Sequence, residues 1–298
     1  MVTDIMQIHQ PLREGLGRDT DQSEFGDVVR VDKLEDGQIY VITLNRPHRM
    51  NSMGDGLGPS LVDAWVQFRD DPIARVAILT GAGNRAFSAG ADLIATSETR
   101  QDEAAEGEAP TRPAPRPGTA SGPAIAPMSE SMGLWKPTIA AINGYAIAGG
   151  FMMSMQCDIR VVAETARIGI AEVRWNMGGA GWMVPVTRQI GLGSALELIL
   201  WGDTQLSGQR MYELGWAQRV VPLDDLMDTA MEYAQRALDM APRAVRNNKQ
   251  ALYRGFYMTP EQGAAFGSAL EQNLQGMKDS VEGPTAFAEK RRPNFVDD

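Results

Sequence analysis

The sequence of 298 residues has one cysteine, Cys157, and only two histidines, His9 and His48. A single cysteine excludes a disulfide within the chain and fits a reducing compartment, so we expect a cytoplasmic protein. Because one histidine lies in a polar N-terminal stretch and the other in a basic loop, a Ser–His–Asp triad has little support. No cysteines and histidines have the spacing of zinc ligands, and we expect no metal.

Long apolar runs and an excess of basic residues are also missing. No apolar run reaches the length of about eighteen residues that a membrane span needs, and residues 1–17 contain no apolar segment of a secretory signal. The formal net charge is −10. Because nucleic-acid binding relies on a basic face, we expect no nucleic-acid partner. The lack of a long apolar run predicts that the membrane is not a partner either. Basic residues still cluster at 46–49 and 290–292, as either a local anion site or a solvated surface.

Apolar periodicity predicts an α/β core followed by a mainly helical part. Residues 28–44 alternate around a Glu-Asp-Gly turn and predict a β-hairpin, residues 57–68 have helical spacing, and residues 75–80 predict a buried strand. A stretch rich in proline and charge, about 101–130, predicts a mobile loop. Later helices are expected at 195–201, 226–241 and 260–275. We divide the chain into a polar arm, a catalytic core and a helical region for oligomerisation and closure of the site: 1–26, 27–205 and 206–298.

Two glycine-rich turns, 87–93 and 143–151, each follow an apolar run and lead toward a predicted helix. Glycine lets the backbone turn sharply and approach a ligand closely. A helix start offers unpaired N–H groups and a positive dipole end. Two such turns that face one point would form an oxyanion hole for a carbonyl oxygen that becomes negatively charged. Two tight turns without a ligand are the alternative.

Residues 81–86 match a loose G-x-G-x-x-A dinucleotide fingerprint after a predicted strand. That fingerprint requires a helix at once and an acidic residue at the end of a second strand about 20 residues later. Sequence rich in proline and charge occupies that place instead. Dinucleotide binding is therefore not expected.

Several segments together resemble the crotonase superfamily, which comprises the enoyl-CoA hydratases and isomerases. The segments occur in the order that the family has: 42–47 followed by Asn51, 86–93, 136–150, 157–160, 166–173 and 282–291. The resemblance covers roughly residues 28–298. It implies an α/β fold, a crotonase-type spiral of ββα units with a C-terminal helical trimerisation region, and a homotrimer or dimer of trimers.

The resemblance also implies a site. The backbone N–H groups of Ala91 and Gly149 would form the oxyanion hole for the thioester carbonyl of an acyl-CoA substrate, and no separate cofactor is expected. Arg46 would lie near the nucleotide end of CoA, whereas Phe287 and Lys290 would reach the CoA of a neighbouring subunit. The implied substrate and CoA contacts are Arg46, Met50, Ala89, Asp92, Leu93, Ile94, Met152, Trp175, Phe287 and Lys290.

The sequence departs from the family pattern at the catalytic glutamates. Typical hydratases of the family carry two glutamates that hold one water; here Met152 stands at the first position and Glu172 at the second. Partial burial of Glu172 among apolar neighbours would raise its pKa toward the useful range for an acid–base group. One carboxylate is enough for a 1,3-proton shift, so isomerisation of a double bond is slightly favoured. A hydratase or hydratase-lyase that uses one glutamate, suggested by Trp175 close to Glu172, stays open, as does a non-catalytic acyl-CoA-binding scaffold.

The segment 177–182 is about one residue shorter than the usual glycine-rich stretch of the family, and it carries a tryptophan. Methionine is flexible and polarisable, and it can line adaptable binding surfaces. The neighbouring methionines therefore predict either a soft wall for a bulky acyl group or ordinary core packing: Met152, Met153, Met155, Met177 and Met183.

Overall fold

Two β-sheets form the centre of the computed structural model, which describes residues 22–97 and 128–298. One sheet has six strands in the order β1-β2-β3-β5-β7-β10, and the other has four in the order β4-β6-β8-β9. The strands are β1 Val29–Leu34, β2 Ile39–Leu44, β3 Val76–Gly81, β4 Ala86–Ser88, β5 Thr138–Ile142, β6 Tyr145–Ile147, β7 Ile159–Ala163, β8 Arg167–Gly169, β9 Gln205–Ser207 and β10 Arg219–Val221.

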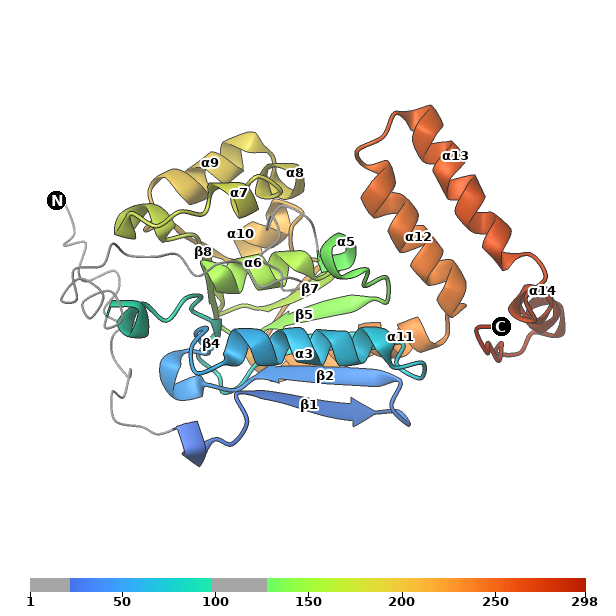
Figure 1. Ribbon diagram of the computed structural model, residues 1–298, viewed down its shortest axis with the longest axis horizontal. Coiled ribbons are helices and arrows are strands. Elements are labelled where there is room, and N and C mark those ends of the chain that lie inside the picture. The colour runs from blue at the N-terminus through green and yellow to red at the C-terminus, as the bar shows by residue number, and fades with distance from the viewer. Residues whose placement is uncertain (1–21, 98–127) are drawn as a thin grey trace.

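Helices surround these sheets and form an arm at the C-terminal end of the chain (Figure 1). The α-helices are α3 Leu57–Asp70, α5 Met128–Met132, α6 Gly149–Gln156, α7 Ala180–Met183, α8 Val186–Ile190, α9 Leu192–Leu200, α10 Gly208–Glu213, α11 Leu226–Leu238, α12 Pro242–Gly255, α13 Pro260–Glu271 and α14 Asp279–Glu289. The 3₁₀ helices are η1 Gln22–Glu24, η2 Pro47–Arg49, η3 Glu172–Trp175, η4 Leu223–Asp225 and η5 Gln272–Leu274. Within the two described ranges, none of the helices is long and apolar enough to cross a membrane.

A ββα pattern repeats along the chain. In each repeat a strand enters the larger sheet, a three-residue strand enters the smaller sheet, and a helical segment follows: β3 and β4 before residues 93–97, β5 and β6 before α6, and β7 and β8 before η3. Strands β2, β3, β5, β7 and β10 are parallel neighbours, so the chain advances across the larger sheet in one direction. Parallel neighbours need crossover connections, and the short strands and helices supply them.

The larger sheet is covered on both faces. Strands β2, β3 and β5 are buried along their whole length. One face packs with α3 and α6 in the main apolar core, and α11 covers the other face through Leu226, Ala230 and Ala234. Parallel strands that are buried on both sides appear in the sequence as continuous apolar runs. The expected hairpin is confirmed by the antiparallel pairing of β1 with β2, and the helix over 57–68 and the strand over 75–80 are confirmed as α3 and β3.

The α/β core extends beyond the expected boundary at residue 205. Strand β10 pairs in parallel with β7, and α11 packs against the same sheet. The part that stands apart from the core is the arm of α12, α13 and α14 (Figure 1). The expected helices at 195–201, 226–241 and 260–275 correspond to α9, α11 and α13 with η5. Residues 1–21 of the expected polar arm and 101–127 of the expected proline-rich loop lie outside the described residues, and residues 128–130 begin α5.

A buried polar cluster attaches the arm to the sheet. Lys249 of α12 places its Nζ 2.7 Å from a carboxylate oxygen of Asp158, at the start of β7. The hydroxyl of Tyr253 donates to the other oxygen of Asp158 at 2.8 Å, and the Thr138 N–H donates at 2.8 Å. Since Lys249 is only 9% exposed, this ion pair is largely desolvated. The arm is therefore anchored at its base.

Candidate active site

Three loops meet at one edge of the smaller sheet. Strands β4, β6 and β8 are parallel neighbours, so their carboxyl ends lie at the same edge. Ala91 follows β4, Gly149 follows β6 and Glu172 follows β8. A hydrogen bond of 2.9 Å from the Ala148 N–H to the carbonyl of Gly169 ties the second loop to the end of β8. The fold thus brings together the groups that the sequence predicts for catalysis.

The two glycine turns contact each other directly. Gly90 has a φ of 83°, and a Cβ on this residue would lie 2.7 Å from the nitrogen of Gly149 and 2.8 Å from the carbonyl oxygen of Ile147. Only glycine fits this position. Among the residues that the structure describes, neither the Ala91 N–H nor the Gly149 N–H donates a hydrogen bond to the protein. Two backbone donors are therefore free to bind a ligand oxygen.

Ala148 sets the direction of the Gly149 N–H, and Met53 covers this residue. Ala148 has φ 56° and ψ −119°, a conformation that is costly for any residue other than glycine and that persists where the surroundings enforce it. It precedes the first residue of α6 and so sets the direction of the Gly149 N–H. Met53 lies over Gly149, because a Cβ there would be 2.3 Å from the Met53 Cε. Met53 cannot be recognised from the sequence as part of the site, since an apolar residue in a loop gives no signal of such a contact.

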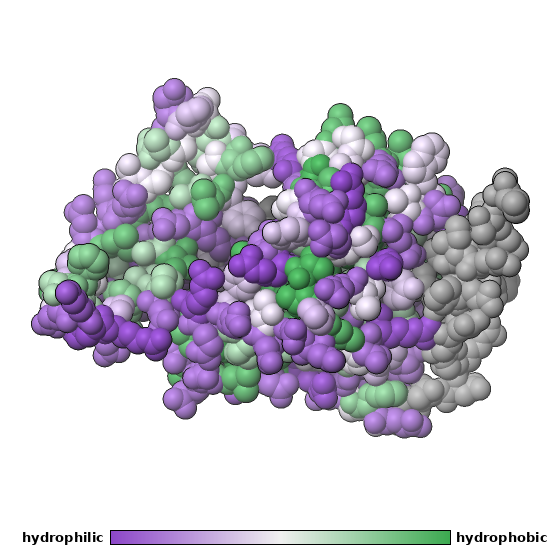
Figure 2. Space-filling view, turned by 180° about the vertical axis from the view of Figure 1, so that it is seen from behind, coloured by the Kyte–Doolittle hydropathy of each residue, from purple (hydrophilic) through white to green (hydrophobic). Residues whose placement is uncertain are grey.

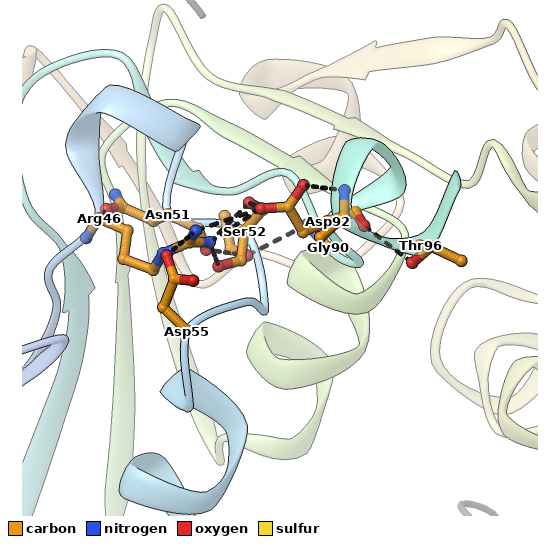
Figure 3. A network of polar contacts seen from close by, with 9 residues as sticks. Arg46, Asn51, Ser52, Asp55, Gly90, Asp92 and Thr96 are labelled. Carbon is orange, nitrogen blue, oxygen red and sulfur yellow. Dashed lines mark hydrogen bonds and ion pairs between the residues drawn. The ribbon is translucent and has the colours of Figure 1, made fainter. Parts of the chain in front are cut away.

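Arg46 lies at the centre of a buried ion-pair network that holds the first turn (Figure 3). Its side chain is 3% exposed and lies 3.2 Å from the carboxylate of Asp92. The guanidinium also pairs with Asp55, which is 58% exposed, and donates to the carbonyl of Ser52 at 2.7 Å. Because Asp92 directly follows Ala91, this network fixes the backbone that carries the first N–H donor.

Asn51 and Ser88 join the loop after β2 to the same turn. The Asn51 side chain accepts from the Arg46 N–H at 2.9 Å and donates to the carbonyl of Ala86 at 2.8 Å. The Ser88 hydroxyl donates to the carbonyl of Asn51 at 2.7 Å and accepts from the Gly90 N–H at 3.1 Å. The charge of Arg46 is thus engaged inside the protein, and its contribution to CoA binding stays a prediction.

Asp92 is ionised within this network. Burial alone would raise its pKa, but hydrogen bonds from the Ala95 N–H and from Arg46 outweigh burial and lower the pKa below the ordinary range. A carboxyl whose pKa is lower in the folded state stabilises the fold above its unfolded pKa. That stabilisation is lost as the pH falls through the lowered value.

We expect Asp92→Ala to lower the free energy of unfolding by about 3 kcal/mol, because it leaves the buried Arg46 guanidinium with one fewer anion. Asp55→Ala removes the exposed partner of the same guanidinium and should cost less than about 1 kcal/mol. Urea denaturation of both variants at neutral pH measures the difference. Equal losses would show that the buried Arg46–Asp92 contact has no special weight.

Glu172 is a buried carboxylate without a cationic partner in the described part of the chain. It is 7% exposed, and its Oε2 accepts no hydrogen bond there. Burial raises its pKa, against the opposite effect of backbone hydrogen bonds at residues 171 and 172. The other two buried carboxylates of the described residues, Asp92 and Asp279, both accept hydrogen bonds. The expected burial of Glu172 is confirmed, and burial acts on its pKa in the expected direction.

The remaining predicted contacts divide into a near group and a distant group. Met50 is 2% exposed, and its carbonyl accepts from the Ala89 N–H at 2.9 Å beside the first turn. Leu93 and Ile94 begin the helical segment that follows Asp92. Met152 is half-buried in α6 and Trp175 is exposed at the end of η3. Three of the other methionines belong to the buried core, which supports ordinary packing for them: Met153, Met155 and Met183.

Phe287 and Lys290 are the distant group. Both lie at the end of α14, on the arm and away from α6 (Figure 1). Phe287 is 86% exposed. The adjacent Arg291 is paired with Glu282 and Glu289. The fold therefore does not bring these residues to the site of their own chain, and their predicted contact with the CoA of another subunit is untested.

The chain has extensive sequence similarity to known proteins. Residues 35–298 match a family model described as enoyl-CoA hydratase/isomerase. The chain is 34% identical over 262 residues to the (E)-benzylidenesuccinyl-CoA hydratase of Thauera aromatica, a match that covers 86% of this chain and 95% of that protein. It is 35% identical over 262 residues to the carnitinyl-CoA dehydratase of Salmonella paratyphi B, with 86% and 94% covered.

A solved structure with the same fold is the crystal structure of an enoyl-CoA hydratase from Bacillus anthracis. The match has a TM-score of 0.79 and 32% sequence identity, and it covers 91% of this chain and all of the other. The predicted fold class is confirmed.

Proposed function

The chain belongs to the enoyl-CoA hydratase/isomerase family, the crotonase superfamily, and on this premise we propose that it isomerises the double bond of an unsaturated acyl-CoA with Glu172 as its single acid–base group. The observation that carries the proposal is the state of Glu172. It is buried, its Oε2 has no hydrogen-bond partner among the described residues, and burial raises its pKa. A carboxyl whose pKa is raised holds a proton more readily than an ordinary glutamate, and this suits a group that both accepts and returns one.

In the proposed mechanism the thioester oxygen binds between the N–H groups of Ala91 and Gly149. Glu172 removes a proton from one carbon of the acyl chain, and the electron pair moves toward the thioester to form an enolate. The two N–H donors stabilise the negative oxygen, each by about 3 kcal/mol in the transition state. The protonated Glu172 then returns a proton two carbons away, and the double bond is shifted with no net change in atoms.

Met152 supports isomerisation over hydration. Its side chain is half-buried in the first turn of α6, three residues after Gly149. A thioether cannot transfer a proton or hold a water in the way that a carboxylate does. A 1,3-proton shift needs one carboxylate, whereas the two-glutamate hydration of typical family members needs a second one here.

Hydration by Glu172 alone is the second candidate. The relatives named above are a hydratase and a dehydratase, and this favours the addition or removal of water by the present chain as well. In that reaction Glu172 would take the proton of a water that attacks the β-carbon and would then supply the proton at the α-carbon. A non-catalytic acyl-CoA-binding scaffold is disfavoured, because it has no need of a buried, unpartnered carboxylate.

Product analysis distinguishes these reactions. The enzyme is incubated with a 3-enoyl-CoA and, separately, with a 2-enoyl-CoA in deuterated water, and the products are analysed by mass spectrometry and NMR. A shifted double bond without added water supports isomerisation. A β-hydroxyacyl product would make hydration the main reaction, and tight binding without turnover would indicate a scaffold.

The pH dependence of catalysis should reflect the buried carboxyl. Glu172 must be ionised to accept a proton, and burial raises its pKa above the ordinary value of 4.5. We therefore expect kcat/KM to fall as the pH is lowered through a limb that lies above that value. The same shift means that Glu172 destabilises the fold as the pH rises through its raised pKa. A kcat/KM that stays constant down to pH about 4 would contradict the assignment.

We also propose a homotrimer or a dimer of trimers, in which Phe287 and Lys290 reach a neighbouring CoA. Apolar residues are exposed on α9 and on the arm: Leu192, Leu196, Leu200, Trp201, Leu252 and Phe256. Figure 2 shows apolar side chains gathered on the upper part of the core, where α9 exposes three leucines. Contiguous exposed apolar surface is typical of protein interfaces. Light scattering after gel filtration should give three or six times the mass of one chain, and a monomer would contradict the proposal.

A further inference from the structure

The side chains of Glu172 and Trp182 approach each other beside Gly179. A Cβ on this residue would lie 3.4 Å from the Cγ of Glu172 and 3.1 Å from the indole Nε1 of Trp182. It would also lie 2.6 Å from the Cε of Met183. The acid–base side chain and the indole nitrogen therefore flank the same small space. The absence of a side chain at Gly179 keeps that space open.

The Trp182 indole N–H is an unused donor. Among the described residues it donates no hydrogen bond, and its nitrogen is not sealed from solvent, unlike that of the fully buried Trp216. The backbone holds the residue in place, since the Trp182 N–H donates to the carbonyl of Gly179 at 3.1 Å in the turn that starts α7. An indole N–H can donate but cannot accept or transfer a proton. It is thus suited to binding an oxygen, not to acid–base work.

We propose that Trp182 is a specificity residue whose indole N–H binds an acceptor oxygen on the acyl group of the substrate, next to Glu172. This inference rests on the proposed function of the site. A purely hydrocarbon acyl chain that displaced water from the space beside Gly179 would leave the N–H without a partner, and this is costly. An acyl group with an oxygen beyond the thioester, as a hydroxyl or a carboxylate, satisfies the donor.

Apolar side chains around Trp182 strengthen the expected preference for an acyl group that carries an oxygen. Met183 is 7% exposed and packs in the main core beside Trp182. Met152 is half-buried and offers no hydrogen-bond donor of useful strength. Trp182, as a donor, and Glu172 are therefore two polar groups among the described residues that an acyl oxygen on this side of the site can contact.

Binding to a matched pair of proteins tests the proposal without depending on turnover. Glu172→Gln and Glu172→Gln with Trp182→Phe are titrated by calorimetry with butyryl-CoA, 3-hydroxybutyryl-CoA and succinyl-CoA. Phenylalanine keeps an aromatic ring but removes the N–H. We expect the Kd of an oxygen-bearing thioester to rise about fivefold for a hydroxyl and about thirtyfold for a carboxylate, as for neutral and charge-assisted hydrogen bonds. The Kd of butyryl-CoA should change less than about twofold.

Each pattern of change in the three Kd values has a different meaning. A selective loss for 3-hydroxybutyryl-CoA or for succinyl-CoA supports the proposal and identifies the kind of oxygen. An equal loss for all three ligands would mean that the ring only packs, and no loss would mean that the N–H stays in solvent; either result overturns the proposal. Failure of the proposed function would appear elsewhere, as full turnover by Glu172→Gln.

A second pair of variants tests the proposal independently, in case the Trp182→Phe substitution disturbs folding. Gly179→Ala places a methyl group against Trp182 Nε1 and Glu172, whereas Gly178→Ala adds one where nothing lies within 4 Å. We expect Gly179→Ala to weaken the oxygen-bearing ligands selectively and Gly178→Ala to leave all three Kd values unchanged. If the two variants behave alike, the space beside Gly179 is not the binding site of the acyl oxygen.

Discussion

Glu172→Gln should lower kcat about 100- to 10,000-fold while KM changes little, because the amide keeps the shape of the side chain but cannot accept the proton. Residues 22–97 and 128–298 contain no other buried carboxylate without a partner, so none of their buried carboxylates is free to replace it. Steady-state kinetics with the substrate identified by product analysis measure the effect.

Two controls keep this result interpretable. Glu164→Gln makes the same chemical change at an exposed glutamate in the turn between β7 and β8, and it should leave kcat unchanged. Glu172→Gln should also be at least as stable as the wild type at pH about 8, because it removes a carboxylate whose ionisation burial disfavours. A Glu172→Gln variant with wild-type kcat would refute the acid–base assignment.

The second large effect is expected at the oxyanion hole. Gly149→Pro removes the N–H that the thioester oxygen would accept from, and kcat should fall about 100- to 1,000-fold. Proline is tolerated at the first residue of a helix, which is the position of Gly149 in α6. The variant is therefore expected to fold, and circular dichroism with a thermal melt checks this.

Gly149→Ala is the matched control, since it adds a Cβ but keeps the N–H. Gly149 does not have a positive φ, so alanine is conformationally permitted. Its Cβ would meet the Met53 Cε at 2.3 Å, the movable end of a flexible side chain, and we expect only a modest loss of kcat. If Gly149→Ala is as inactive as Gly149→Pro, the loss reflects crowding by Met53 and not the missing donor.

The longer elements of the fold could be predicted because burial leaves a pattern in them. Helix α3 has an apolar stripe, and strands β3 and β5 are continuous apolar runs that are buried on both faces. Strands β4, β6 and β8 were not predicted as strands, because three residues show no periodicity. The boundary at residue 205 divides a sheet for the same reason: β10 is short and joins β7 only in three dimensions.

Residues of the proposed site could be predicted from the sequence where the backbone or a charge gives a signal. They could not be predicted where their place depends on packing against distant residues. Gly90 and Gly149 stand out as glycines, and Glu172 stands out as a charge among apolar residues. The internal pairing of Arg46 with Asp92 could not be foreseen, because 46 positions separate the two residues. In the sequence, an arginine in a basic cluster gives no sign of a distant acidic partner.

The crystal structure of the complex with an unreactive acyl-CoA analogue tests the central claim most directly. That claim is that two amide donors from separate loops and one carboxyl from a third loop act on the same thioester. The account predicts that the thioester oxygen lies within hydrogen-bond distance, about 3 Å, of the nitrogens of Ala91 and Gly149, with the Glu172 carboxyl over the neighbouring acyl carbons. A thioester bound elsewhere, or a Glu172 carboxyl turned away from the acyl chain, would contradict it.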